Sequence, residues 1–437
     1  MENSRFIKAC RGEPVDKTPV WFMRQAGRYM KVYRDLKEKH TFLEMCKTPE
    51  LACEVTLQPL DVLGVDAAII FADILLPLEP MGTGLEFSAG DGPVIPRPVR
   101  DRKAVEKLFP VNAEEQLGFV ADAIRLVRKE INIPLVGFAA APFTLCSYMV
   151  EGGKSREFKT TKLMMYEATD VWEMLMDKVC TMLVDYLKMQ VSAGALALQI
   201  FDSWGGGLSP SDYEKYVLPY SKRVFDGLKD VGVPVINFST GTSTMLGLVQ
   251  KPGGDVLSFD WRIQIDSARA LLEKEQPIQG NLAPGILFAP LPVIREGVHD
   301  ILKRAGIRGH IFNLGHGILQ HTPVEHVKAV TGDHHRVGRE VHLHHFTDRR
   351  VTDVGGNIAR FQLAQQHVNQ NTIGTQIFHR HPTQFFVGAV HRVARLKGNH
   401  FFPTALGDFI ANLYCRAESI REITLEVREI QHLNRAR

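Results

Sequence analysis

Eight short apolar segments recur in the first three quarters of the chain, each separated from the next by enough residues for a helix. Segments that are apolar on both faces are typical of parallel sheets covered by helices, and strict alternation implies right-handed crossovers. Eight such units in about 330 residues predict an α/β fold, a TIM-type (β/α)8 barrel. A doubly wound open sheet is the alternative. The segments are residues 19–23, 67–71, 134–139, 195–201, 234–238, 256–259, 277–279 and 310–314.

Polar residues follow nearly every apolar segment, and this favours the barrel. The carboxyl ends of barrel strands converge on one mouth, where active sites are found. We therefore expect the residues after these segments to form one site. The candidates are Arg24 and Arg28 after the first segment, Asp73 after the second, Tyr148 after the third, Ser203 after the fourth and His316 after the last.

Arg24 and Arg28 follow a short apolar run and lie four residues apart. Guanidinium groups bind carboxylates through two hydrogen bonds and stay charged at any working pH. The pair is therefore a candidate clamp for a multiply charged anion. The alternative is an exposed helical face, where charge is usually uninformative.

Asp73 lies in an apolar stretch between Phe71 and Leu75. A carboxylate in such surroundings is costly unless it is paired. It could cap a helix, or it could accept hydrogen bonds from a ligand and stabilise a cation that forms during a reaction.

The three remaining candidates also have ordinary structural interpretations. A tyrosine such as Tyr148 usually packs in a core with its hydroxyl hydrogen-bonded. Ser203 precedes three consecutive glycines, which would let the backbone come close to a ligand. His316 lies between two glycines that would expose it, as a hydrogen-bond donor or a proton carrier.

Composition indicates a soluble cytoplasmic protein. Apolar residues make up 45% of the 437 residues, charged residues 23%, and the net charge is only +3. The six cysteines form no C-x-x-C pair, which argues for reduced thiols. The amino terminus lacks an apolar signal region, and the longest apolar-rich run, residues 191–201, is too short to span a bilayer. No membrane partner is expected.

Several familiar catalytic motifs are missing from the sequence. It contains no H-E-x-x-H, no C-x-x-C, no G-x-S-x-G, and no Walker or dinucleotide pattern. No lysine follows an apolar segment where a Schiff base would form. The candidates therefore predict proton chemistry on an anionic organic molecule, with no metal and no cofactor.

Five motifs in register resemble those of the uroporphyrinogen decarboxylase family from about residue 4 to about residue 330. They are WFMRQAGRY at 21–29, FADIL at 71–75, YMVEGG at 148–153, FDSWGG at 201–206 and NLGHG at 313–317. The resemblance implies a distorted (β/α)8 barrel and a homodimer. It also implies a carboxy-lyase of haem biosynthesis that removes carbon dioxide from the four acetate side chains of uroporphyrinogen III, giving coproporphyrinogen III, without cofactor or metal.

The resemblance also implies roles for individual residues. The substrate-binding positions correspond to Arg24, Gln25, Ala26, Gly27, Arg28, Asp73, Tyr148, Ser203 and His316. Ionised Asp73 would face the pyrrole N–H groups and stabilise a cationic intermediate. Arg24 is a poor acid near pH 7, so a substrate carboxyl, a water or His316 is the better candidate for the proton donor.

The last hundred residues have a different composition, and the resemblance stops near Thr331. Residues 332–437 hold eleven of the 17 histidines and 13 arginines but a single lysine. We interpret this His- and Arg-rich tail as another reading frame or a gene-junction artefact. A metal-binding extension and a basic nucleic-acid-binding tail are the alternatives. For residues 1–331, the predicted catalytic domain, no nucleic-acid partner is expected.

Two other functions compete with the decarboxylase prediction. One is a corrinoid-linked methyltransferase on a similar barrel, which would need His and Cys zinc ligands at strand ends; no His-x-Cys occurs there. The other is a porphyrin-binding protein that is catalytically impaired because of its altered carboxyl terminus. Turnover of uroporphyrinogen would separate all three.

Overall fold

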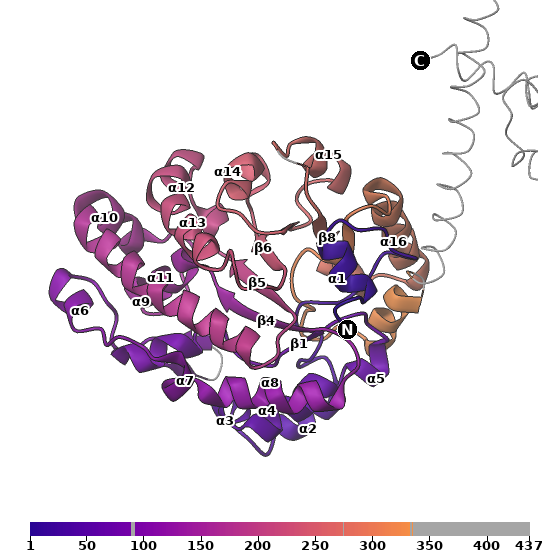
Figure 1. Ribbon diagram of the computed structural model, residues 1–437, viewed down its shortest axis with the longest axis horizontal. Coiled ribbons are helices and arrows are strands. Elements are labelled where there is room, and N and C mark those ends of the chain that lie inside the picture. Colours follow the sequence, from indigo (N-terminus) through magenta and orange to yellow (C-terminus); the bar gives the residue numbers. More distant parts are fainter. Residues whose placement is uncertain (89–91, 274, 333, 335–437) are drawn as a thin grey trace, which may run out of the picture. The chain divides into compact units, whose positions relative to one another are not determined.

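The computed structural model describes residues 1–88, 92–273, 275–332 and 334. The predicted tail, residues 332–437, lies outside the described residues except for Gly332 and His334. Figure 1 shows strands at the centre of the described part and helices around them.

Seven parallel strands form one sheet in the order β1-β4-β5-β6-β7-β8-β9. Each strand except β1 follows its neighbour in sequence order, as in a barrel, and the predicted TIM-type α/β fold is confirmed. Their bounds are β1 Ala68–Ile69, β4 Leu135–Ala140, β5 Ala197–Asp202, β6 Val235–Ser239, β7 Val256–Phe259, β8 Ile278–Leu282 and β9 His310–Leu314.

The first predicted strand, residues 19–23, is reduced to a single parallel bridge between Val20 and Phe312 of β9. The prediction of a full strand there is wrong. Pro19 has no N–H to donate, and the Val20 N–H donates to the Asp66 carboxylate instead of to a backbone carbonyl. Asp66 N–H in turn donates to Val20 O at 2.7 Å, just before β1. Segment 19–23 therefore lies between β9 and β1 and completes the ring.

The pairing between β1 and β4 ends early, because β1 has only two residues. Farther along β4, the Gln190 side chain takes the place of a strand: it accepts from Phe138 N at 2.8 Å and donates to Phe138 O at 2.9 Å. A Cβ on neighbouring Gly137 would lie 2.5 Å from the Gln190 oxygen, so this contact needs glycine. The barrel is thus distorted at the strand that leads to Asp73.

We expect Gln190→Leu to lower the free energy of unfolding by about 2 kcal/mol, because a buried N–H and a buried C=O would both lose their partner. Urea unfolding followed by circular dichroism measures the change. The control is Lys188→Leu on the exposed face of the same helix, where a change within about 0.5 kcal/mol is expected. Equal effects of the two substitutions would contradict the role of Gln190.

The helices lie outside the sheet (Figure 1). Residues 49–63 form two helices that are divided near Pro59, and the second ends at Gly64, which has a φ of 62°. Residues 159–192 form two helices divided at Ala168. The bounds are α1 Arg5–Cys10, α2 Lys31–Lys37, α3 Phe42–Lys47, α4 Pro49–Leu57, α5 Leu60–Leu63, α6 Arg102–Glu106, α7 Ala113–Gln116, α8 Gly118–Glu130, α9 Pro142–Glu151, α10 Lys159–Glu167, α11 Thr169–Ser192, α12 Pro210–Tyr216, α13 Leu218–Gly227, α14 Leu246–Gln250, α15 Ile265–Ala270 and α16 Leu291–Ala305.

The elements that were not predicted from the sequence include a hairpin and a helix. One is an antiparallel hairpin of β2, Glu86–Ser88, and β3, Gly92–Val94. The other is α9, which begins at Pro142 directly after β4 and carries Tyr148. Short 3₁₀ or π turns complete the described part: Leu76–Leu78, Glu79–Thr83, Gly205–Gly207, Ser243–Met245 and Pro284–Phe288.

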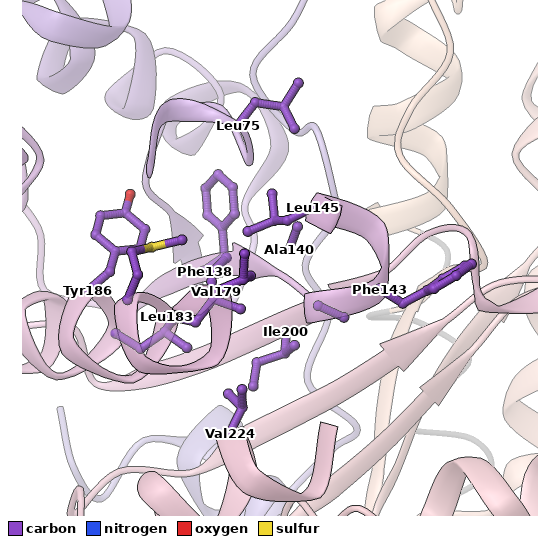
Figure 2. Close-up of a cluster of buried hydrophobic side chains, with 14 of the residues drawn as sticks. Leu75, Phe138, Ala140, Phe143, Leu145, Val179, Leu183, Tyr186, Ile200 and Val224 are labelled. Atoms are coloured by element: carbon purple, nitrogen blue, oxygen red, sulfur yellow. The ribbon is translucent and has the colours of Figure 1, made fainter. Parts of the chain in front are cut away.

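The core has an apolar layer outside the sheet and a polar network within the barrel. Figure 2 shows Val179, Leu183 and Tyr186 on α11 gathered beside Phe138 of β4, as part of one buried cluster. In the barrel, Gln279 accepts from Trp21 Nε1 at 3.0 Å and donates to the side chains of Gln199 (2.9 Å) and Ser258 (3.0 Å). This network ties segment 19–23 to β5, β7 and β8.

Candidate active site

Asp73, Ser203 and His316 follow the carboxyl ends of β1, β5 and β9. Tyr148 lies in α9, which begins after β4, and Arg24 and Arg28 follow segment 19–23. Arg24 acts electrostatically on three of the others. Burial raises the pKa of Asp73 and of Tyr148, and the charge of Arg24 opposes this rise; burial lowers the pKa of His316, and the charge of Arg24 adds to this fall. Among the described residues, neither Arg28 nor Ser203 makes a hydrogen bond or ion pair with these four. The structure therefore places Arg24, Asp73, Tyr148 and His316 in one electrostatic unit.

The arginine loop, residues 24–28, is held by its buried glutamine. Gln25 accepts from the Phe22 N–H and donates to Ala67 O, both at 3.3 Å, while Tyr29 OH donates to Gln25 O at 2.6 Å. These bonds fix the backbone and leave Ala26 and Gly27 partly exposed. In this structure the hydrogen-bonding groups of the Gln25 side chain are therefore used by backbone groups of the protein.

Both arginine side chains of this loop are exposed. Within the described part of the chain, neither guanidinium forms an ion pair, and the Arg28 hydrogen bond to Gln320 is long, at 3.4 Å. Arg24 also has a φ of 57°, a left-handed conformation that is uncommon outside glycine. Two guanidiniums without an ion-pair partner, on an anchored loop, can donate hydrogen bonds to the carboxylates of a ligand.

Asp73 is partly buried after β1, and burial raises the pKa of its carboxyl to about 6. The Leu75 N–H, which donates to Oδ1 at 2.8 Å, and the charge of Arg24 oppose that shift. At pH 7 the carboxylate is therefore mostly ionised. Its second oxygen, Oδ2, has no hydrogen-bond partner among the described residues, so it can accept from a ligand.

Tyr148 projects from α9 and stacks on Trp204, with ring centroids 3.9 Å apart. Burial raises the pKa of the Tyr148 hydroxyl to about 12, so it stays protonated and can donate a hydrogen bond. Sequence reasoning missed Trp204, although it lies in the same motif as Ser203. The stacking partner of Tyr148 could not be predicted, because the two rings are 56 positions apart.

The Ser203 loop is fixed by Asp202, which sequence reasoning also missed. The Asp202 carboxylate is buried and accepts from Thr144 Oγ1 at 3.1 Å and from Gly205 N at 2.9 Å. Burial raises the pKa of Asp202 to about 6. Through its hydrogen bonds to α9 and to the turn after Ser203, this buried carboxylate helps to hold Trp204 against Tyr148.

His316 lies in a tight segment after β9. A Cβ on Gly315 would lie 2.5 Å from Trp261 N, and one on Gly317 would lie 2.5 Å from Arg24 Cδ. The two glycines thus let His316 lie between the loop after β7 and Arg24. Burial, together with the charge of Arg24, lowers the pKa of His316 to about 4. The ring is therefore neutral at pH 7 and acts as a hydrogen-bonding group.

Within the residues that the structure describes, no three His, Cys, Asp or Glu side chains gather closely enough to hold a metal ion. No helix in the same residues is both long and apolar enough to cross a membrane.

Comparison with known proteins gives the family. The family model for uroporphyrinogen decarboxylase (URO-D) matches residues 1–337. The uroporphyrinogen decarboxylase of Carboxydothermus hydrogenoformans is 55% identical over 329 residues, which cover 75% of this chain and 94% of the relative. The uroporphyrinogen decarboxylases of Trichlorobacter lovleyi and Geobacter metallireducens are 54% and 53% identical to this chain. Each match covers 77% of this chain, and the two matches cover 99% and 100% of the respective relative.

The chain belongs to the uroporphyrinogen decarboxylase family. The family resemblance predicted from five motifs is thereby confirmed, and the curated relatives are carboxy-lyases by name.

A solved structure with a different printed function has the same fold. A methyltransferase from Methanosarcina mazei superposes with a TM-score of 0.66 at 21% identity, over 76% of this chain and 97% of the other. At this identity the likeness shows the fold alone. The likeness therefore does not bear on the methyltransferase alternative.

Proposed function

We propose that this chain removes carbon dioxide from the four acetate side chains of uroporphyrinogen III and so forms coproporphyrinogen III. Membership of the uroporphyrinogen decarboxylase family supports the reaction. The observation that carries it is Asp73: a partly buried, mostly ionised carboxylate with a free oxygen, beside an unpaired Arg24. Such a pair suits an anionic substrate that must pass through a cationic intermediate.

The chemistry divides between the arginines and Asp73. Arg24 and Arg28 bind substrate carboxylates, while Asp73 Oδ2 accepts hydrogen bonds from pyrrole N–H groups. A proton adds to a ring carbon and makes the ring cationic. The electron pair of the bond to the carboxyl carbon then flows into the ring, and carbon dioxide leaves. A second proton then adds to the exocyclic carbon and makes it a methyl group, and the ring carbon gives up the first proton, which restores the neutral pyrrole. Asp73 is fixed before the reaction and favours the cation over the neutral ring.

Neither Arg24 nor His316 is suited to donate the first proton. Arg24 holds its proton too tightly near pH 7, and His316 is neutral there because burial lowers its pKa. We assign the donation to a substrate carboxyl or to a water. Tyr148, Ser203 and His316 then serve as hydrogen-bonding groups that orient the substrate.

We expect kcat/KM of the wild-type protein to fall as pH drops below about 6, because protonation neutralises Asp73. His316→Asn should keep this acidic limb and raise KM about fivefold, as expected for loss of one hydrogen bond. Initial rates from pH 5 to pH 8 test this. A limb that disappears in His316→Asn would show that His316 is the titrating group.

The test of the function is incubation of the protein with uroporphyrinogen III without oxygen, followed by chromatography of the products. Products with seven, six, five and four carboxyl groups are expected. A protein that binds the substrate but returns it unchanged would instead be the impaired porphyrin-binding protein that the altered carboxyl terminus could produce.

The same proposal covers assembly and location. We propose a homodimer in the cytoplasm, working without cofactor or metal and without nucleic-acid partners. Within the described residues Cys10, Cys46, Cys53, Cys146 and Cys180 are free thiols, which supports a reducing compartment. Light scattering of the purified protein measures the assembly.

A further inference from the structure

A third arginine lies at the mouth of the barrel, in the loop after β7. Arg262 forms an ion pair with Asp260, and the two side chains differ greatly in exposure: Arg262 is 51% exposed and Asp260 is 2% exposed. The carboxylate is therefore inside the fold, while much of the guanidinium remains open to solvent.

The Arg262 side chain is held in place from two directions. The Asp260 carboxylate accepts hydrogen bonds from the backbone N–H of Arg262 at 3.0 Å and from the backbone N–H of Gly241 at 2.7 Å, so it cannot turn freely. The guanidinium also lies over the Trp261 ring, 4.6 Å from its centroid. Its remaining nitrogens have no partner among the described residues. A fixed guanidinium with a free edge loses little side-chain entropy when it binds a carboxylate.

Arg24 and the loop that carries Arg262 both pack against the segment around His316. Gly315 contacts the backbone of Trp261, next to Arg262 in the chain, and Gly317 contacts the Arg24 side chain. The charges of both arginines also lower the pKa of His316, behind the larger effect of burial. The cationic wall of the mouth therefore continues past His316 to the loop after β7.

We propose that Arg262 binds a carboxylate of the substrate beside His316, in addition to those bound by Arg24 and Arg28. The inference rests on the proposed function, which gives the site a substrate with eight carboxylates. Arg24 and Arg28 can hold a few of these, and the remainder need other cations around the mouth. The competing interpretation is that Arg262 only balances the buried charge of Asp260.

Steady-state kinetics with Arg262→Gln separate the two interpretations. Loss of a charged hydrogen bond to the substrate should raise KM at least about tenfold while kcat stays within about threefold. Arg262→Lys retains a charge near Asp260 and should recover part of the KM. The matched control is Arg223→Gln, which removes an arginine of similar exposure (49%) from its ion pair with Asp177 on outer helices. KM within twofold of wild type for Arg262→Gln would overturn the proposal.

A binding measurement keeps this test independent of turnover. Uroporphyrinogen binding is followed without oxygen by tryptophan fluorescence, since Trp204 and Trp261 both lie at the mouth, in an Asp73→Asn background where turnover is slow. Adding Arg262→Gln should weaken binding about tenfold. Failure of the wild type to release carbon dioxide would overturn the proposed function alone. Unchanged binding on adding Arg262→Gln would overturn the role of Arg262 alone.

Discussion

Asp73→Asn is expected to lower kcat about 100-fold, because the neutral amide cannot stabilise a cationic ring as an ionised carboxylate does. The Leu75 N–H can still donate to Oδ1 of the amide, so the loop geometry should persist. Single-turnover rates with saturating uroporphyrinogen at pH 7 measure the effect. A loss of less than about tenfold, or ~1.4 kcal/mol of barrier, would contradict the assignment.

Thermal unfolding provides the control for Asp73→Asn. Burial raises the pKa of Asp73 above its unfolded value, so the charged form costs stability in the folded state. The substitution removes that cost, and we expect a Tm equal to or above that of wild type at pH 7. Any gain in Tm should fade as pH falls from about 6 to about 4, because the carboxyl of the folded state becomes protonated over this range. At lower pH the carboxyl is protonated in both the folded and the unfolded state, and no gain is expected. A large fall in Tm would mean that the rate loss reflects misfolding.

Arg24→Gln is expected to lower kcat/KM about 100-fold, because it removes a charged hydrogen-bond donor from the mouth. It should also move the acidic limb of the pH profile upward, since the positive charge of Arg24 lowers the pKa of Asp73. The profile of kcat/KM from pH 5 to pH 8.5 shows both effects.

The control for Arg24→Gln is Arg125→Gln on α8, whose arginine pairs with Asp122 on an exposed surface. Neither the rate nor the limb should change in that variant. If the acidic limb of the kcat/KM profile stays near pH 6 in Arg24→Gln, the charge of Arg24 does not affect the pKa of Asp73.

Strand positions followed from the sequence to within a few residues where the backbone makes the ladder. Predicted bounds 256–259 and 310–314 are those of β7 and β9. Prediction failed at residues 19–23, where Asp66 and Asn313 side chains take the place of backbone partners. It also missed the gap beside β4, because Gln190 reaches it from a helix 52 positions away. Side-chain substitutes for a strand leave no periodic signal.

The candidate site was predictable in its members but not in its electrostatics. Position after an apolar segment was enough to select Arg24, Asp73 and His316 as candidates. The neutral state of His316 depends on burial against distant residues, which no local pattern encodes. Arg262 was overlooked for the same reason: its importance comes from a buried partner and from its place beside His316, not from a motif.

The central claim is that ionised Asp73, in an arginine-lined mouth, drives loss of carbon dioxide from an octacarboxylate. The most direct measurement counts the carbon dioxide released from uroporphyrinogen III labelled in its acetate carboxyl groups, with wild type and Asp73→Asn side by side. We predict four equivalents per substrate for wild type, at a rate that Asp73→Asn lowers about 100-fold. No release from wild type, or equal release from both proteins, would contradict the claim.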